Sequence, residues 1–174
     1  MKGWLLDTSV IAEVSGAKPD PRVRPWISAQ DESALFLSVL TLPEYDKGIH
    51  NLRETDSRRP RLRTAVAALE ARFRGCVLPL SDATVRRWGV ISGETKRVTK
   101  HSPSVIDTML AATAIEHWLY FVMRNTQDVI RSGASLFNPW IIHLRSQFFE
   151  PIDTKTQCQL TWRESPHQNP MLHG

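Results

Sequence analysis

The sequence has few residues of the kind that form disulfide scaffolds or zinc sites. Among its 174 residues there are two cysteines, Cys76 and Cys158, which lie far apart in the chain. Two cysteines cannot make a scaffold of several disulfides, and their separation lacks the close spacing of a zinc-binding pair. The six histidines also form no pair at a useful ligand spacing. A zinc site is therefore not expected.

Long apolar runs and several well-known catalytic motifs are absent as well. No stretch approaches the roughly 18 to 20 apolar residues that a membrane-spanning helix needs. Near the N-terminus, Asp7 falls where a signal peptide requires apolar residues. The sequence has no Gly-rich phosphate loop and no Ser or Cys nucleophile motif. We therefore expect a soluble, cytoplasmic protein whose chemistry rests on other residues.

Charge of one sign is only slightly in excess. Twenty-two Lys and Arg residues stand against 18 Asp and Glu residues, which gives a formal net charge of +4 and a pI near 9.4. This excess permits a polyanionic partner but does not require one. Six arginines between residues 58 and 74 form a basic stretch. Such a stretch is typical of a solvated face, and it would offer phosphate contacts to a polyanionic partner.

What the chain does contain is an alternation of short apolar runs with longer helical patterns. A hydrophobic fraction of 41% at this length suits one globular core. Buried parallel strands are predicted over residues 4–6, 35–39, 76–80 and 119–123. Helices are predicted over 8–14, 42–52, 62–73, 82–100 and 104–118, with Ser102 before Pro103 as the cap of the last. The pattern favours an α/β domain over residues 1–140 and a C-terminal extension over 141–174 that is partly docked or disordered.

Four acidic residues follow predicted strands or begin predicted helices: Asp7, Glu44, Asp107 and Asp128. The ligand crevice of an open parallel sheet lies at the carboxyl ends of its strands, so these residues are expected to gather at one edge. Each also has a simpler interpretation, because an acid at such a position caps a helix or complements its dipole. Asp107 opens the least polar helix of the chain, where a carboxylate needs a partner or a metal.

A cluster of carboxylates predicts a divalent cation of the oxygen-binding kind. Clustered carboxylates repel and raise one another's pKa unless a cation lies between them. Mg²⁺ and Mn²⁺ bind few protein carboxylates and keep water molecules that a substrate phosphate can join. Such an ion can activate water and neutralise charge on phosphate, which is the chemistry of phosphodiester hydrolysis.

Five motifs, in order along residues 3–140, carry a family resemblance. They are residues 5–11 (Leu-Leu-Asp-Thr-Ser-Val-Ile), Pro43-Glu44 with 47–49 (Lys-Gly-Ile), Asp107 with 111–114 (Ala-Ala-Thr-Ala), Arg124-Asn125 with Asp128, and Asn138-Pro139-Trp140. One such motif alone is weak, whereas five in this order are specific. The chain resembles the PIN-domain ribonucleases, in particular the VapC-like toxins of type II toxin-antitoxin systems and their FitB-like branch.

The resemblance implies a three-layer α/β/α domain with a short, mainly parallel sheet and the activity of a metal-dependent endoribonuclease. It implies that Asp7, Glu44 and Asp107 form the acidic core that binds Mg²⁺ or Mn²⁺, with Asp128 or Asn125 completing it. Ser9 matches a position whose side chain supports the first aspartate. The implied partners are an RNA substrate, a cognate antitoxin, a second copy in a homodimer, and operator DNA through the antitoxin complex.

The chain departs from the family pattern at the fourth strand. Asn125 stands where many relatives have an aspartate, and Met123 stands where they usually have Ser or Thr. These departures motivate a rival hypothesis, in which the chain is a catalytically weakened PIN-like protein that acts mainly by binding an antitoxin or RNA. Arg124 is the basic residue nearest to the acids in sequence, and it either holds a phosphate or pairs with Asp128.

Overall fold

A parallel sheet forms the centre of the computed structural model, which describes residues 3–16 and 18–141. Within these residues the sheet has five strands: β1 (Trp4–Leu6), β2 (Leu35–Ser38), β3 (Val77–Leu78), β4 (Tyr120–Val122) and β5 (Ser135–Phe137). Their order is β3-β2-β1-β4-β5, and every neighbouring pair is parallel. Leu5 of β1 lies opposite Phe36 on one side and Phe121 on the other. The predicted α/β class with a short parallel sheet is confirmed.

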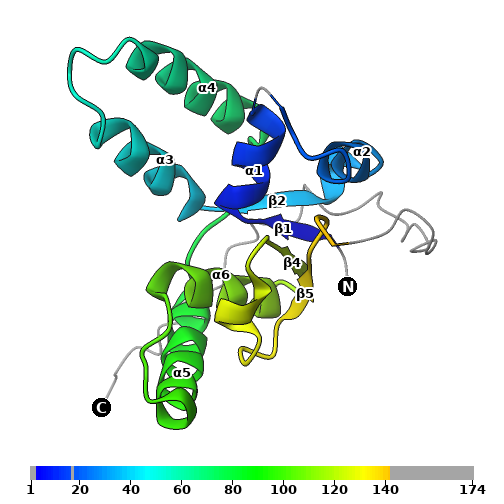
Figure 1. Ribbon diagram of the computed structural model, residues 1–174. Helices are drawn as coiled ribbons and strands as arrows, with labels where there is room; N and C mark the ends of the chain where they lie inside the picture. The colour runs from blue at the N-terminus through cyan, green and yellow to red at the C-terminus, as the bar shows by residue number, and fades with distance from the viewer. Residues whose placement is uncertain (1–2, 17, 142–174) are drawn as a thin grey trace, which may run out of the picture.

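Helices cover both faces of this sheet. They are α1 (Thr8–Ser15), α2 (Val23–Ser28), α3 (Thr41–His50), α4 (Arg58–Arg72), α5 (Asp82–Thr99) and α6 (Val105–Glu116), with short 3-10 turns at Glu32–Ala34 and Thr126–Val129. Figure 1 shows α1 to α4 on one side of the sheet and α5 with α6 on the other. The three-layer α/β/α arrangement is therefore confirmed. None of the helices in the described part of the chain is long and apolar enough to cross a membrane.

The core lies between the central strands and the small-residue face of α6. Leu5, Leu6 and Phe121 are fully buried in the sheet, and residues 110–114 of α6 are all buried. Four of those five α6 residues are Ala or Thr, whose small side chains let the helix approach the strands closely. Close packing here fixes the start of α6, and with it Asp107, relative to the ends of the strands.

An aromatic cluster explains two elements that the sequence analysis missed. The ring of Trp4 in β1 stacks on Tyr120 of β4 with centroids 4.9 Å apart. It also contacts Phe137 at 5.0 Å and Trp26 at 5.3 Å, in edge-on geometry. Phe137 belongs to β5 and Trp26 to α2, the strand and helix that no apolar run predicted. Pairs of aromatic rings in such geometries stabilise their elements beyond simple burial.

Several predicted boundaries are wrong by a few residues. The helix predicted from residue 62 begins at Arg58, so five of the six arginines of the basic stretch lie inside α4. Ser104, not Ser102, caps α6, because its Oγ accepts the N–H of Asp107 at 3.4 Å. The boundary at residue 140 remains a prediction, because the C-terminal extension beyond Ile141 lies outside the described residues.

A carboxylate at the end of α6 joins that helix to the start of α5. Glu116 accepts a hydrogen bond from Ser81, the α5 N-cap, at 2.6 Å and another from the hydroxyl of Thr84. Thr84 is fully buried. Replacing Glu116 by Ala removes the carboxylate that accepts from both hydroxyls and leaves the Thr84 hydroxyl only the Ser81 hydroxyl, 3.2 Å away. Losing hydrogen bonds to a charged acceptor costs about 2 kcal/mol.

We therefore expect Glu116→Ala to lower the free energy of unfolding by about 2 kcal/mol in urea denaturation followed by circular dichroism. The matched control is Glu94→Ala, which removes an exposed glutamate from α5 and should change stability by less than about 0.5 kcal/mol. Equal effects of the two substitutions would show that the Glu116 contacts do not stabilise the helix pair.

Candidate active site at the carboxyl edge of the sheet

Asp7 lies at the carboxyl end of the central strand and begins α1. Its carboxylate accepts the N–H of Ser9 at 2.8 Å, which caps the helix, and its own N–H donates to the Val122 carbonyl of β4 at 2.9 Å. The residue is only 8% exposed. The helix N-terminus stabilises negative charge in this position, which offsets part of the cost of burying a carboxylate there.

Glu44 comes from the first turn of α3 and reaches the same helix. The hydroxyl of Thr8 donates a hydrogen bond to the Glu44 carboxylate, and the Tyr45 hydroxyl donates to the Thr8 carbonyl at 3.4 Å. Burial raises the pKa of Glu44 above its ordinary value, against the opposing effect of the Thr8 hydrogen bond. The charges of Asp7 and Asp107 raise this pKa further.

Asp107 is the second acid of the site whose pKa is raised. It is half-buried in the first turn of α6, and burial is the main cause that raises its pKa, against the hydrogen bond from Ser104. The charges of Asp7 and Asp128 also raise it. Asp7, Glu44, Asp107 and Asp128 thus come from four different segments. The charge of Asp7 reaches both Glu44 and Asp107, and the charge of Asp128 reaches Asp107.

The segment after β4 carries the remaining predicted polar residues. The Asn125 side-chain amide donates to the Asp128 carboxylate at 2.6 Å, and both residues are exposed. The N–H of Arg124 donates to the Ser9 hydroxyl at 3.4 Å, so Ser9 joins this segment to the start of α1. Met123 is 3% exposed and packs in the hydrophobic core.

The donor set has the composition of a magnesium or manganese site. All candidate ligands are oxygen atoms of Asp, Glu or Asn, and a cation would relieve the repulsion that raises the two pKa values. No group of three or more His, Cys, Asp or Glu side chains among the described residues is close enough to hold one ion. Mg²⁺ commonly takes one or two carboxylates and completes its shell with water and phosphate, and the residues present fit that mode.

Comparisons with known proteins agree with this arrangement. A family model described as the PIN domain matches residues 4–127. The chain belongs to the PIN-domain family. The VapC ribonuclease Y4jK of Sinorhizobium fredii is 29% identical over 136 residues, which cover 78% of this chain and 96% of that protein.

Two further similarities involve Neisseria gonorrhoeae. The toxin FitB of that organism is 29% identical over 139 residues, covering 78% of this chain and 97% of FitB. A crystal structure of FitAcB from the same organism superimposes with a TM-score of 0.71 at 26% identity. That superposition covers 80% of this chain and 99% of the other. The predicted resemblance to this family is confirmed.

Sequence reasoning missed two residues of α1 that join this helix of the PIN domain to other segments around the site. Thr8, which binds Glu44, directly follows Asp7, but a hydroxyl beside a helix cap is too common to predict a contact with α3. Glu13, whose carboxylate accepts hydrogen bonds from Asp20 and Trp140, lies four residues after Ser9. That spacing places Ser9 and Glu13 on one helix face, which is the signal that could have found it.

Removing one of the repelling carboxylates should stabilise the metal-free protein. We expect Glu44→Gln, which keeps an oxygen to accept from Thr8, to raise the free energy of unfolding in EDTA at pH 7 by about 0.5 kcal/mol. The effect is small because solvent screens a half-buried charge. Asp107→Asn should act in the same direction. Thermal unfolding at several pH values measures both.

The pH dependence has a defined sign. A carboxyl whose pKa is raised in the folded state binds its proton more tightly there, so ionisation costs stability above that pKa. The advantage of Glu44→Gln should therefore shrink as the pH falls from 7 toward the ordinary value of 4.5. Glu54→Gln, at an exposed position, is the control and should show no such gain. Lower stability of both site variants at pH 7 would contradict the inferred repulsion.

Proposed function

We propose that the chain is a Mg²⁺- or Mn²⁺-dependent endoribonuclease that acts as a cytoplasmic toxin and is neutralised by a cognate antitoxin. The observation that carries this proposal is the set of Asp7, Glu44, Asp107 and Asp128 at the carboxyl edge of the sheet, where burial, together with the charge of Asp7, raises the pKa of Glu44 and Asp107. Membership of the PIN-domain family and the similarity to a VapC ribonuclease support it.

The residues divide into ligands and groups that orient them. Asp7 and Asp107 would bind the metal directly. Asp128, which Asn125 orients through their 2.6 Å hydrogen bond, would act as a further ligand through one of the water molecules of the ion. A bound divalent ion supplies an activated water and neutralises charge on the phosphate. Glu44 lies within reach of the charges of Asp7 and Asp107, and its raised pKa would suit it to hold a proton taken from the attacking water. Thr8 fixes the direction of the Glu44 carboxylate.

An apolar groove beside α1 supports the proposed antitoxin partner. The groove has a volume of about 480 Å³ and is lined by residues of α1 and α4 that include Ile11, Leu62, Val66 and Leu69. α4, which the structure describes in full, contains no buried residue. A helix of this length with exposed apolar side chains is suited to bury them against another chain. We also propose that the chain forms a homodimer and that its complex with the antitoxin binds operator DNA through the antitoxin.

The decisive experiment is cleavage of total RNA by the purified protein, freed of antitoxin, with Mg²⁺, Mn²⁺ or EDTA. We expect fragments with either metal and none with EDTA. Asp7→Asn and Asp107→Asn should reduce cleavage at least 100-fold, because each removes a charged ligand, while Asn at position 7 keeps the α1 cap. The matched control is Asp46→Asn, which removes an exposed acid from α3 and should leave cleavage unchanged.

Cleavage that persists in EDTA or in the Asp7 and Asp107 variants would contradict the proposed mechanism. No cleavage at all by a folded protein would favour the rival hypothesis of a PIN-like binding protein.

The segment after β4 distinguishes the working enzyme from a weakened one. If Asp128 is the working ligand, Asp128→Asn should reduce cleavage about tenfold or more. Asn125→Asp should give no gain, because it replaces the hydrogen bond to Asp128 with repulsion between two carboxylates. Initial rates at saturating Mg²⁺ measure both effects. A large gain from Asn125→Asp would show instead that Asn125 marks a weakened active site.

A further inference from the structure

Arg124 is held from three sides at the edge of the active site. Its N–H donates to the Ser9 hydroxyl at 3.4 Å, and its carbonyl accepts the side-chain amide of Asn138 at 2.6 Å. Its guanidinium carbon lies 5.7 Å from the centre of the Trp140 ring, within the range of a cation–π contact. Backbone and side chain of this exposed residue are thus both positioned by neutral groups.

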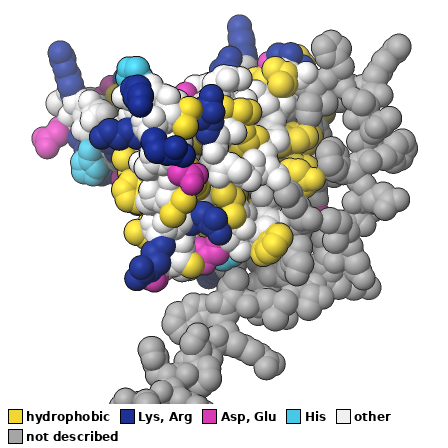
Figure 2. Space-filling view, turned by 90° about the horizontal axis from the view of Figure 1, so that it is seen from below, with side chains coloured by type: hydrophobic (Ala, Val, Ile, Leu, Met, Phe, Trp, Pro, Cys, Tyr) yellow, Lys and Arg dark blue, Asp and Glu magenta, His cyan; other side chains and the backbone are white. Residues whose placement is uncertain are grey.

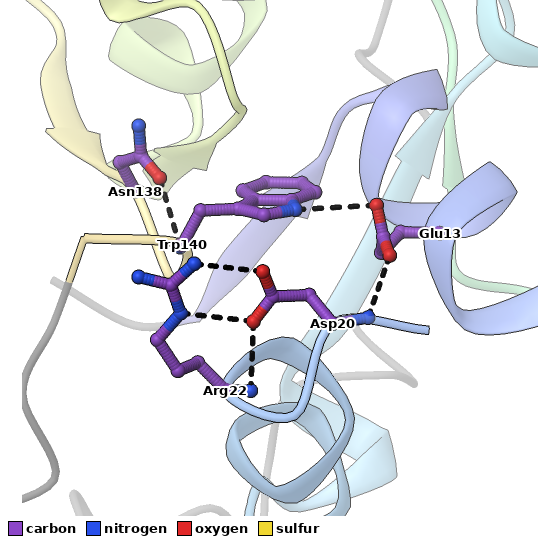
Figure 3. Close-up of polar contacts among 5 residues, drawn as sticks. All are labelled: Glu13, Asp20, Arg22, Asn138 and Trp140. Atoms are coloured by element: carbon purple, nitrogen blue, oxygen red, sulfur yellow. Dashed lines mark hydrogen bonds and ion pairs between the residues drawn. The ribbon is translucent and has the colours of Figure 1, made fainter. Parts of the chain in front are cut away.

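Trp140 is itself fixed in a defined orientation (Figure 3). Its indole Nε1–H donates to the Glu13 carboxylate at 3.2 Å, and its backbone N–H donates to the Asn138 side-chain oxygen at 2.9 Å. The other Glu13 oxygen accepts the N–H of Asp20 at 2.7 Å. The indole is 5% exposed, so the ring beneath Arg124 cannot turn freely.

The charge of Arg124 is left available for a ligand. Among the described residues, the ion pairs involve Arg22, Arg58, Arg72 and Arg86, and none involves Arg124. Asp20 lies near enough for Arg124 to contribute to its low pKa of about 2, but the hydrogen bonds of Arg22 are the main cause. An arginine that is positioned without an ion pair, and whose backbone is bonded to Ser9 two residues after Asp7, is suited to bind a phosphate.

We propose that Arg124 binds a backbone phosphate of the RNA next to the one that is cleaved, and that Trp140 and Glu13 are positioning residues for this contact. The inference rests on the proposed nuclease function and adds a substrate contact to it. Ser9 and Glu13 lie one helical turn apart on the same face of α1. Asp7 lies at the start of α1, and the Arg124–Trp140 contact lies further along this helix, on the side of β5. The phosphate that Arg124 binds is therefore not the scissile one.

The test combines RNA binding with cleavage. Binding of a fluorescently labelled 20-nucleotide single-stranded RNA is measured by anisotropy in EDTA at several salt concentrations, and cleavage kinetics are measured with Mg²⁺. We expect Arg124→Ala to weaken binding about fivefold and to raise KM similarly, with kcat changed less than twofold. The slope of log affinity against log salt should fall in magnitude by about 0.7, the value for one lost contact with a single strand.

The positioning role of Trp140 needs a separate readout. Trp140→Phe, which keeps a ring in the core but loses the bond to Glu13, should raise KM about twofold to threefold. In an Arg124→Ala background it should add nothing, because the residue that it positions is gone.

Arg124→Lys keeps the charge and should restore most of the salt slope. Arg86→Ala, at an exposed arginine that is paired with Asp82, controls for loss of net charge.

The outcomes separate this inference from the proposed function. Metal-dependent cleavage with KM and salt slope unchanged in Arg124→Ala would overturn the phosphate contact and leave the nuclease standing. RNA binding that depends on Arg124 without cleavage would support the contact and contradict the nuclease. Additive effects of Trp140→Phe and Arg124→Ala would overturn the positioning role. The absence of both RNA binding and RNA cleavage would overturn both proposals.

Discussion

The hydrogen bond from the Ser9 N–H to the Asp7 carboxylate is the contact on which the arrangement of this edge depends. It ends the central strand and begins α1 at a single residue. Once α1 is fixed there, its side chains reach three segments: Thr8 contacts α3, Ser9 contacts the segment after β4, and Glu13 contacts the segment after β5. A cap that elsewhere stabilises one helix by about 1 kcal/mol therefore also sets the relative positions of the candidate ligands.

The same edge is costly for folding. Burial and mutual repulsion raise the pKa of Glu44 and Asp107, which means that their charged forms are less favourable in the folded protein than in the unfolded chain. The rest of the domain supplies the compensating stability, through the buried strands, the small-residue face of α6 and the hydrogen bonds that Glu116 accepts from the start of α5. Stability that is spent at a cluster of like charges is characteristic of a functional site, because a folding requirement alone would select a neutral residue there.

The sequence was sufficient to predict the elements that have strong local patterns. The central strands, α1, α5 and α6 follow from apolar runs, caps and helical spacing, and the acids were placed at one edge because parallel strands end together. β5 and α2 could not be predicted in this way. Ser135–Phe137 has only partly buried residues, and its place in the sheet depends on contacts of Phe137 with Trp4 and Trp26, which are distant in sequence. Contacts of this kind carry no local signal.

The site shows the same division between local and tertiary information. Which residues carry negative charge is evident from the sequence, whereas the groups that orient them, Thr8 for Glu44 and Asn125 for Asp128, are evident only from the packing.

The basic residues show this difference between local and tertiary information most clearly. Figure 2 shows Lys and Arg side chains spread over one face among hydrophobic and acidic ones, not gathered in one patch. On that face, the distribution of charge therefore does not mark an RNA contact. An arginine that is fixed by neutral neighbours keeps its charge for a ligand, and among the described residues Arg124 combines that property with a place beside the acids.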